Sequence, residues 1–331
     1  MISVVIPTLG RPSLSALLER IRDDDLEIIV VDDRPDRDDR LETPGRVIAG
    51  PARGPAAARN AGWRAARHEW VVFLDDDVLP DPDWPRRLKA DLAAAGPEIG
   101  GVQGVLSVPL PDDRRPTDWE RVTAGLADGA WITADMAFRR TALSAVGGFD
   151  ERLPRAFRED AELAFRVRQA GWQLRRGDRR TTHPVRPESR WVSLRTQRGN
   201  ADDALLRRLY GPRWRDLLAI PPGRRPRHAA VTAAGALALA TGVTAAITRR
   251  PGWALAAAAA TTAWAAGTAE FAATRIAPGP RDRHEVATML LTSVAIPPVA
   301  IAYWLRGWWR WRSAEPASAP AGTPATRVVA A

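Results

Sequence analysis

The stretch Trp70-Val-Val-Phe-Leu-Asp75-Asp-Asp-Val-Leu-Pro80 places a continuous apolar run directly before three carboxylates. An unbroken run of β-branched and aromatic residues is typical of a strand that is buried on both faces. Open α/β sheets bind their ligands at the carboxyl ends of such strands. Three adjacent carboxylates repel one another, and a hard divalent cation such as Mg²⁺ or Mn²⁺ would offset that repulsion. From this stretch alone, a solvated turn rich in Asp and Pro is the alternative.

The residues around this stretch alternate between short apolar runs and helix-like segments. Strands are predicted at Ile2–Ile6, Glu27–Val31 and Val71–Leu74. Helices are predicted at Pro12–Arg22, Pro55–Arg67, Trp84–Ala95 and Arg158–Ala170, the last of them ended by Gly171. This alternation indicates parallel βαβ units, and therefore an α/β sheet over the front half of the chain.

Composition narrows the class of protein. The 331 residues contain no cysteine, which excludes disulfides, thiol catalysis and thiolate metal sites. Residues 1–174 hold 24 basic and 30 acidic side chains, whereas residues 175–228 hold 15 arginines and 5 acids. An acidic front domain argues against a nucleic-acid partner. The positive charge lies just ahead of long apolar segments, which favours a membrane surface.

Three long apolar segments follow a basic, Pro-rich linker at 221–228, within a predicted membrane region at 229–312. The candidate membrane spans are 229–248, 252–274 and 286–305, each about the length that crosses a bilayer as a helix. The alternative is a set of Ala-rich core helices in a soluble domain. Three spans would put the C-terminal tail outside the cell, and two would return it to the cytosol. Residues 313–331, rich in Ala, Pro, Ser and Thr, are predicted to be disordered.

Five ordered blocks within residues 1–200 together resemble the family 2 glycosyltransferases, which have the GT-A fold, a Rossmann-like nucleotide-diphospho-sugar transferase domain. The blocks are Ser3–Pro12, Glu27–Asp33, Arg53–Trp63, Asp75–Asp77, and Gly147–Glu151 with Phe157–Arg166. Each block is weak alone, and their order and spacing carry the resemblance. It implies a catalytic domain over 1–220 on the cytosolic side of the cell membrane, anchored by a multi-pass region. The amino terminus lacks the pattern of a signal peptide.

The resemblance implies a donor site whose residues lie at strand ends and on one helix. A carboxylate there can accept hydrogen bonds from a nucleobase or ribose, and an arginine can donate a fork of them to a diphosphate. The implied nucleotide-sugar-binding residues are Pro7, Thr8, Asp32, Asp33, Arg59, Asp75, Asp76 and Asp135; the implied metal ligands are Asp77, Asp75 and His183. A helical surface arginine and a structural histidine are the alternatives for Arg59 and His183.

The fifth block implies the catalytic base. An inverting transfer needs a carboxylate that takes a proton from the attacking acceptor hydroxyl. By resemblance this carboxylate is Asp160, with Glu159 orienting the acceptor or adjusting the pKa of Asp160. The alternative is that both acids only stabilise the first turn of a helix through its dipole. Gln197-Arg-Gly199 lacks the Gln-x-x-Arg-Trp pattern of processive polymerising members, which argues against a polysaccharide synthase.

The sequence therefore predicts a metal-dependent, inverting transfer of a sugar from a nucleotide-diphosphate sugar to a hydroxyl acceptor. The membrane region and the arginines of 175–228 favour a lipid-linked or cell-envelope acceptor. Two alternatives remain. One is a non-catalytic, membrane-anchored scaffold that keeps the fold. The other is a sugar nucleotidyltransferase, although Thr8-Leu-Gly-Arg-Pro12 is poor in the glycines that such enzymes need after the first strand.

Overall fold

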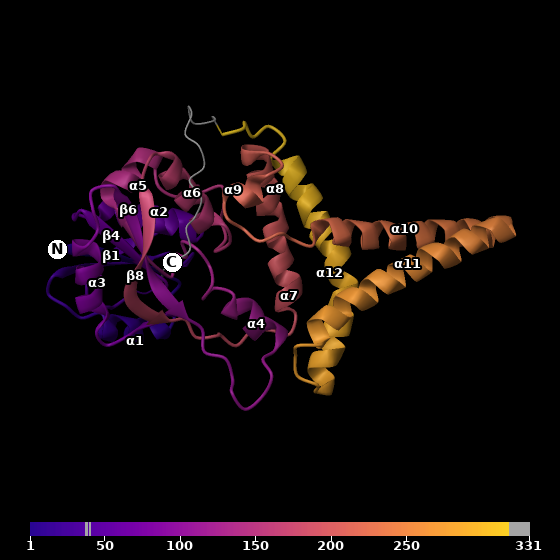
Figure 1. Ribbon diagram of the computed structural model, residues 1–331, viewed down its shortest axis with the longest axis horizontal. Coiled ribbons are helices and arrows are strands. Elements are labelled where there is room, and N and C mark those ends of the chain that lie inside the picture. Colours follow the sequence, from indigo (N-terminus) through magenta and orange to yellow (C-terminus); the bar gives the residue numbers. More distant parts are fainter. Residues whose placement is uncertain (37–38, 40, 318–331) are drawn as a thin grey trace.

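The computed structural model describes residues 1–36, 39 and 41–317, and its front part is built on one mixed eight-stranded sheet (Figure 1). The strand order is β3-β2-β1-β4-β7-β6-β8-β5. The strands are β1 (Ile2–Thr8), β2 (Leu26–Asp32), β3 (Arg46–Ala49), β4 (Trp70–Leu74), β5 (Leu79–Pro80), β6 (Ile99–Ser107), β7 (Asp135–Arg139) and β8 (Gln173–Thr182). Strands β3, β2, β1 and β4 are parallel, and β7 runs antiparallel to β4. The prediction of an α/β fold is confirmed.

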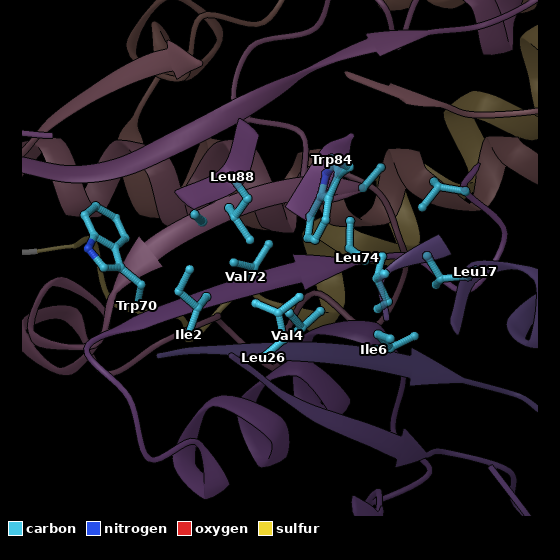
Figure 2. Close-up of a cluster of buried hydrophobic side chains, with 14 of the residues drawn as sticks. Ile2, Val4, Ile6, Leu17, Leu26, Trp70, Val72, Leu74, Trp84 and Leu88 are labelled. Atoms are coloured by element: carbon cyan, nitrogen blue, oxygen red, sulfur yellow. The ribbon is translucent and has the colours of Figure 1, made fainter. Parts of the chain in front are cut away.

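Helices cover both faces of the sheet. On one face, α1 (Ser13–Arg20) and α3 (Trp84–Ala93) pack their apolar sides on alternate residues of β1 and β4, including Val4 and Val72 (Figure 2). On the other face, α2 (Pro55–Ala65), α5 (Arg140–Val146) and α6 (Glu159–Gln169) pack on the residues between them, such as Val5 and Phe73. The unbroken apolar runs in these strands follow from burial on both faces.

The register of the central strands brings the predicted site to one edge. Thr8 pairs with Asp32, and the end of β4 pairs with Asp135 at the start of β7. The acids that follow these parallel strands therefore lie side by side at the carboxyl edge of the sheet, as the sequence predicts.

The described chain after β8 is helical. Its helices are α7 (Val192–Arg195), the 3-10 helix η1 (Thr196–Gly199), α8 (Asn200–Tyr210), α9 (Trp214–Leu217), α10 (Arg225–Thr248), α11 (Pro251–Ile276) and α12 (Arg283–Arg310), whereas α4 (Asp118–Ala124) lies between β6 and β7. Helices α10 and α11 form a hairpin that extends away from the sheet, and α12 lies along α8, between the hairpin and the sheet (Figure 1). Helix α10 begins inside the segment predicted as a linker without helical structure, because Pro226 is tolerated in a first helical turn.

Two of the three candidate membrane spans are supported by helix length and apolarity. Among the described residues, α10 and α12 are long and apolar enough to cross a bilayer. In an apolar stretch of 18 residues, the buried share is 6% in α10 and 39% in α12. Helix α11, predicted as a third span, is not in this group, because its apolar content is mostly alanine and it carries Glu270 and Arg275 near its end. The exposed large apolar side chains of this region lie on all three helices: Leu237, Leu239, Val243, Ile247, Trp253, Leu255, Leu290, Leu291, Val294, Leu305, Trp308 and Trp309. Of the segment predicted to be disordered, residues 318–331 lie outside the described residues.

Buried polar contacts join the sheet domain to the base of α11 and α12. Asp118, the first residue of α4, forms an ion pair of 2.8 Å with Arg275 of α11. Arg275 is 8% exposed and also donates a 2.8 Å hydrogen bond to the Thr292 hydroxyl of α12. The Asp118 backbone amide donates to Glu285 of α12 at 2.9 Å. These contacts fix the position of α4 on the two helices.

Candidate active site

A cavity of about 200 Å³ opens at the carboxyl edge of β1, β2 and β4. Seven of the residues predicted for the donor and metal site line it: Pro7, Thr8, Asp33, Arg59, Asp75, Asp76 and Asp77. Further lining comes from Arg11, Gly54 and Arg186, and from Ala156 in the segment that leads into α6. Asp32, Asp135, Glu159, Asp160 and His183 are not in this lining, although Glu159 and His183 contact residues that are.

Asp76 holds the ends of two strands together. It is 1% exposed, and one carboxylate oxygen accepts a 2.6 Å hydrogen bond from the Thr8 hydroxyl. The other oxygen accepts from the Arg11 guanidinium at 2.5 Å. Thr8 ends β1 and Arg11 follows it, so these contacts hold the end of β1 and its turn against the turn after β4. Asp76 therefore shapes the floor of the cavity.

Asp33 and Asp32 point to different partners. Asp33 accepts hydrogen bonds from the backbone amides of Ala52 at 2.7 Å and Gly54 at 3.3 Å, which shapes the loop before α2. Gly54 has a φ of +97°, and a Cβ there would lie 2.1 Å from the Pro154 carbonyl oxygen, so only glycine fits. Asp32 accepts a forked pair of hydrogen bonds from Arg34, at 3.0 and 2.9 Å. Asp33 lies on the cavity wall, and Asp32 beside it.

Asp75, Asp77 and His183 form a group that can hold a divalent cation. One ligand atom from each lies within 4.8 Å of the others. His183 follows β8, and its Nε2 atom is 3.9 Å from Asp77 Oδ1. Burial, and then the neighbouring Asp75 carboxylate, raises the pKa of Asp77. Two carboxylates and an imidazole suit Mg²⁺ or Mn²⁺, so the residues present fit the predicted metal.

Arg59 is a buried bridge between the cavity and α6. Its guanidinium is 2% exposed and forms ion pairs of 2.7 Å with Asp75 and 2.9 Å with Glu159. Burial, and then the neighbouring Asp160 carboxylate, raises the pKa of Glu159 to about 8 despite Arg59. One Glu159 oxygen and the Arg59 Nε are buried without a hydrogen-bond partner among the described atoms.

Asp160 lies in the first turn of α6, where a strained residue precedes it. Arg158 has a φ of +76°, a backbone conformation that residues other than glycine rarely adopt. This conformation is held by the stacking of Arg158 on Phe157 and by an ion pair of 3.4 Å with Asp203. Asp160 accepts a 2.7 Å hydrogen bond from the Ala161 amide, and burial raises its pKa. The strained turn therefore sets where the Asp160 carboxylate lies.

Asp135 lies in a buried polar cluster behind the cavity. It is fully buried, and its carboxylate accepts hydrogen bonds from Arg179 at 2.7 Å, Thr181 at 2.6 Å and the Trp84 indole at 2.8 Å. Arg179 is fully buried too and also pairs with Asp91 of α3 at 3.1 Å. The cluster joins β7, β8 and α3 beside the end of β4.

Sequence reasoning did not single out Arg186 or Arg11. The Arg186 Nε lies 2.9 Å from Asp77 Oδ2, so this arginine meets the same carboxylate as the predicted metal. Its only signal was its place three residues after His183, among the 15 arginines of 175–228. Arg11 lies in the first block, but nothing in its spacing indicated a partner 65 residues away.

Replacing Arg59 by Met is expected to destabilise the protein by roughly 3–5 kcal/mol, because it leaves Asp75 and Glu159 without a buried cationic partner. Without Arg59, the pKa of Glu159 rises further, so the folded state keeps a proton that the unfolded state releases. The loss should therefore be larger at pH 8 than at pH 6. Chemical denaturation at both pH values measures it. Arg64→Met on the same helix is the control, because Arg64 is exposed and its ion pair with Glu151 is 3.7 Å long. Equal losses in both variants would contradict a bridging role.

Comparisons with known proteins agree with this architecture. Residues 3–123 match the family model described as glycosyl transferase family 2. A pre-mycofactocin glycosyltransferase from Mycobacterium tuberculosis is 31% identical over 195 residues, covering 53% of this chain and 40% of that protein. The succinoglycan biosynthesis protein ExoO from Rhizobium meliloti is 39% identical over 85 residues, covering 22% of this chain and 23% of that protein. The chain thus spans less than half the length of these curated relatives.

Among solved structures, glucosyl-3-phosphoglycerate synthase from Mycobacterium tuberculosis, in complex with Mn²⁺, uridine-diphosphate-glucose and phosphoglyceric acid, has a TM-score of 0.44 and 18% identity. The match covers 67% of this chain and 81% of that chain. The match to this family model covers residues 3–123, which lie within the part of the chain whose sequence resembles the family 2 glycosyltransferases.

Proposed function

We propose that the protein transfers a sugar from a nucleotide-diphosphate sugar to an acceptor hydroxyl. The observation that carries this proposal is the convergence of Asp75, Asp77 and His183 beside the cavity that Asp33 and Arg59 line. The family match and the glycosyltransferase relative support the same class of reaction. A scaffold would have no need for two carboxylates and an imidazole gathered beside a cavity.

The donor is proposed to bind with its base and ribose near Pro7, Thr8 and Asp33, at the ends of β1 and β2. Asp76 and Asp32 hold this region through Thr8, Arg11 and Arg34. Asp135 contributes from behind, because its cluster braces the start of β7 beside Leu74. The diphosphate would lie toward Asp75 and Arg59, where Arg186 offers a second guanidinium that can donate to it.

Asp75, Asp77 and His183 are proposed to hold Mg²⁺ or Mn²⁺, which when bound offsets the negative charge of the leaving nucleoside diphosphate. Arg186 pairs with Asp77 in the structure, so its guanidinium already offsets one of these carboxylates. Opposite charge at close range favours the ionised carboxylate, so Arg186 acts against the burial that raises the pKa of Asp77, but it also occupies a carboxylate oxygen that the cation would use.

Asp160 is proposed as the base. The acceptor oxygen attacks the anomeric carbon as the bond to the diphosphate breaks, and the proton of the acceptor hydroxyl passes to Asp160. Attack opposite the leaving group inverts the anomeric configuration. Glu159 and Arg59 position Asp160, because Arg59 connects Glu159 to Asp75 across the cavity wall. The raised pKa of Asp160 makes it a stronger base than an ordinary aspartate.

The acceptor is proposed to be lipid-linked or part of the cell envelope. Helix α10 is long, apolar and almost entirely exposed, as a membrane anchor requires, and α12, which also packs along α8, carries exposed apolar side chains beside it. The catalytic domain would then lie on the cytosolic side, where nucleotide sugars are made. Residues 1–220 are the proposed catalytic domain, and the helices from α10 to α12 are the proposed membrane region.

Thermal unfolding with nucleotides tests this function. The detergent-solubilised protein is heated with UDP, GDP or dTDP, each with and without Mn²⁺. A ligand at about a hundred times its dissociation constant stabilises the folded state by roughly 2.7 kcal/mol, which gives a clear rise in melting temperature. We expect a metal-dependent rise with one nucleotide. The absence of any rise with a folded protein would favour the scaffold.

A further inference from the structure

A second cavity, of about 260 Å³, lies between the C-terminal end of α12, η1 with α8, and the segment that follows the Gly147–Glu151 block. We call it the arginine pocket. Five arginines line it: Arg152, Arg155, Arg198, Arg306 and Arg310. Asp202 is the one acid in the described lining, and the walls are completed by Tyr303, Trp311, Pro154, Ala201 and Gly307. It lies outside the proposed donor site, since the two linings share no residue.

The positive charge of the arginine pocket is not neutralised within the described chain. Arg152 pairs with Asp150 at 2.7 Å, and Arg155 pairs with Asp202 at 2.7 Å. The side chains of the other three form no ion pair or hydrogen bond with any described residue, although Arg310 stacks on Trp311: Arg198, Arg306 and Arg310. Arg306 and Arg310 are four residues apart on α12, where like charges destabilise a helix. An anion in the pocket would relieve this repulsion.

The walls of the pocket are held firmly. At Gly307, α12 approaches α8 closely, because a Cβ there would lie 2.5 Å from the Ala201 carbonyl oxygen. The Arg155–Asp202 ion pair then joins the segment before α6 to α8. Arginines from η1, from α12 and from the segment before α6 therefore line the same space, and guanidinium groups suit a ligand with several acceptor oxygens.

We propose that the arginine pocket binds a phosphoryl group. Arg198, Arg306 and Arg310 would donate to its oxygens, and the Tyr303 hydroxyl, which has no partner among the described residues, would donate a further hydrogen bond. Leu305 and Trp309, on the same turns of α12, are 59% and 69% exposed. Apolar side chains beside a phosphoryl site match an amphiphile, so a lipid phosphate is the favoured source and free phosphate is the other.

Binding of phosphoryl probes to the full-length protein in detergent tests this proposal. The probes are dioctanoyl phosphatidic acid, dioctanoyl phosphatidylcholine and inorganic phosphate, titrated by calorimetry. The variant Arg306→Gln with Arg310→Gln should bind phosphatidic acid at least about 10-fold more weakly, because each charge-assisted hydrogen bond is worth on the order of 10-fold in affinity. The control is Arg281→Gln with Arg283→Gln, which removes the same charge near the N-terminal end of α12. It should change affinity by less than about two-fold.

A second variant protects the test against misfolding. Arg198 is an exposed residue of η1, so the variant Arg198→Gln should weaken binding in the same way without altering α12. Phosphatidic acid binding without phosphate binding would identify a lipid source, and binding of both with the same arginine dependence would identify a phosphoryl site open to soluble phosphate. Equal affinity for phosphatidylcholine, or equal losses in the variant and the control, would overturn the proposal. None of the probes is a nucleotide or a sugar, so this result is independent of the proposed transfer.

Discussion

Replacing Asp160 by Asn is expected to lower kcat by about 10²- to 10⁴-fold, which is the usual contribution of a positioned general base. The amide keeps the size of the side chain but cannot accept the acceptor proton. Binding of the donor nucleotide should be unchanged, because Asp160 is not in the lining of the donor cavity. Single-turnover rates and nucleotide affinity, measured on the same preparation, separate these two effects.

The control and the pH profile distinguish a base from an acid that only stabilises a helix. Asp216 is an exposed acid in the first turn of α9, and Asp216→Asn should leave kcat within about two-fold of the wild-type value, in keeping with the small effects usual at exposed positions. In the wild type, activity should fall as the pH drops through a pKa that lies above that of an ordinary aspartate, because burial raises it. If Asp160→Asn kept most of the activity and lost only stability, the helix-dipole interpretation would hold.

Replacing Asp77 by Asn is expected to weaken Mn²⁺ binding by more than about 100-fold. Loss of a group that merely hydrogen-bonds a metal ligand already costs roughly 10- to 100-fold in affinity, and Asp77 is a proposed ligand itself. Titration of free Mn²⁺ by electron paramagnetic resonance measures binding without substrate or turnover. His183→Ala should weaken binding in the same direction.

Asp178→Asn supplies the control for this experiment. Asp178 is an exposed acid on β8, the strand that His183 follows, and its removal should change Mn²⁺ affinity by less than about two-fold. The ion pair with Arg186 gives Asp77 a competing role as the partner of an arginine. Unchanged Mn²⁺ binding in Asp77→Asn, with a lowered melting temperature, would assign Asp77 to that structural role.

The sheet and the edge that carries the site could be predicted because their signals are local. The apolar run before Asp75 and the alternation of strands with helices need only neighbouring residues. The partners of the site residues could not be predicted in this way. Thr8 and Asp76 are 68 residues apart, and Arg59 and Glu159 are 100 apart. Their pairing depends on the order of the strands, which sequence spacing does not contain.

The positions of the arginines in the structure could not be predicted from local sequence either. Residues 175–228 contain 15 of them, and no local pattern distinguishes fully buried Arg179 from cavity-lining Arg186 or exposed Arg198. The sequence predicts a linker over 221–228 because Pro226 and its basic neighbours are typical of one, whereas α10 begins at Arg225. Helix α11 was counted as a span because it carries no charge between Arg250 and Glu270, whereas insertion depends on side-chain apolarity, which alanine supplies only weakly.

The contact between α4 and the base of α11 and α12 determines how the donor cavity is presented. A domain on a flexible tether can tilt and reach toward acceptors at many distances. Here the Asp118–Arg275 ion pair, together with the hydrogen bond to Glu285, holds the sheet domain against those helices. If the protein transfers a sugar to a membrane-held acceptor, as proposed, the acceptor hydroxyl would have to reach the cavity at the position that this contact sets, and the protein would then select acceptors by length as well as by chemistry.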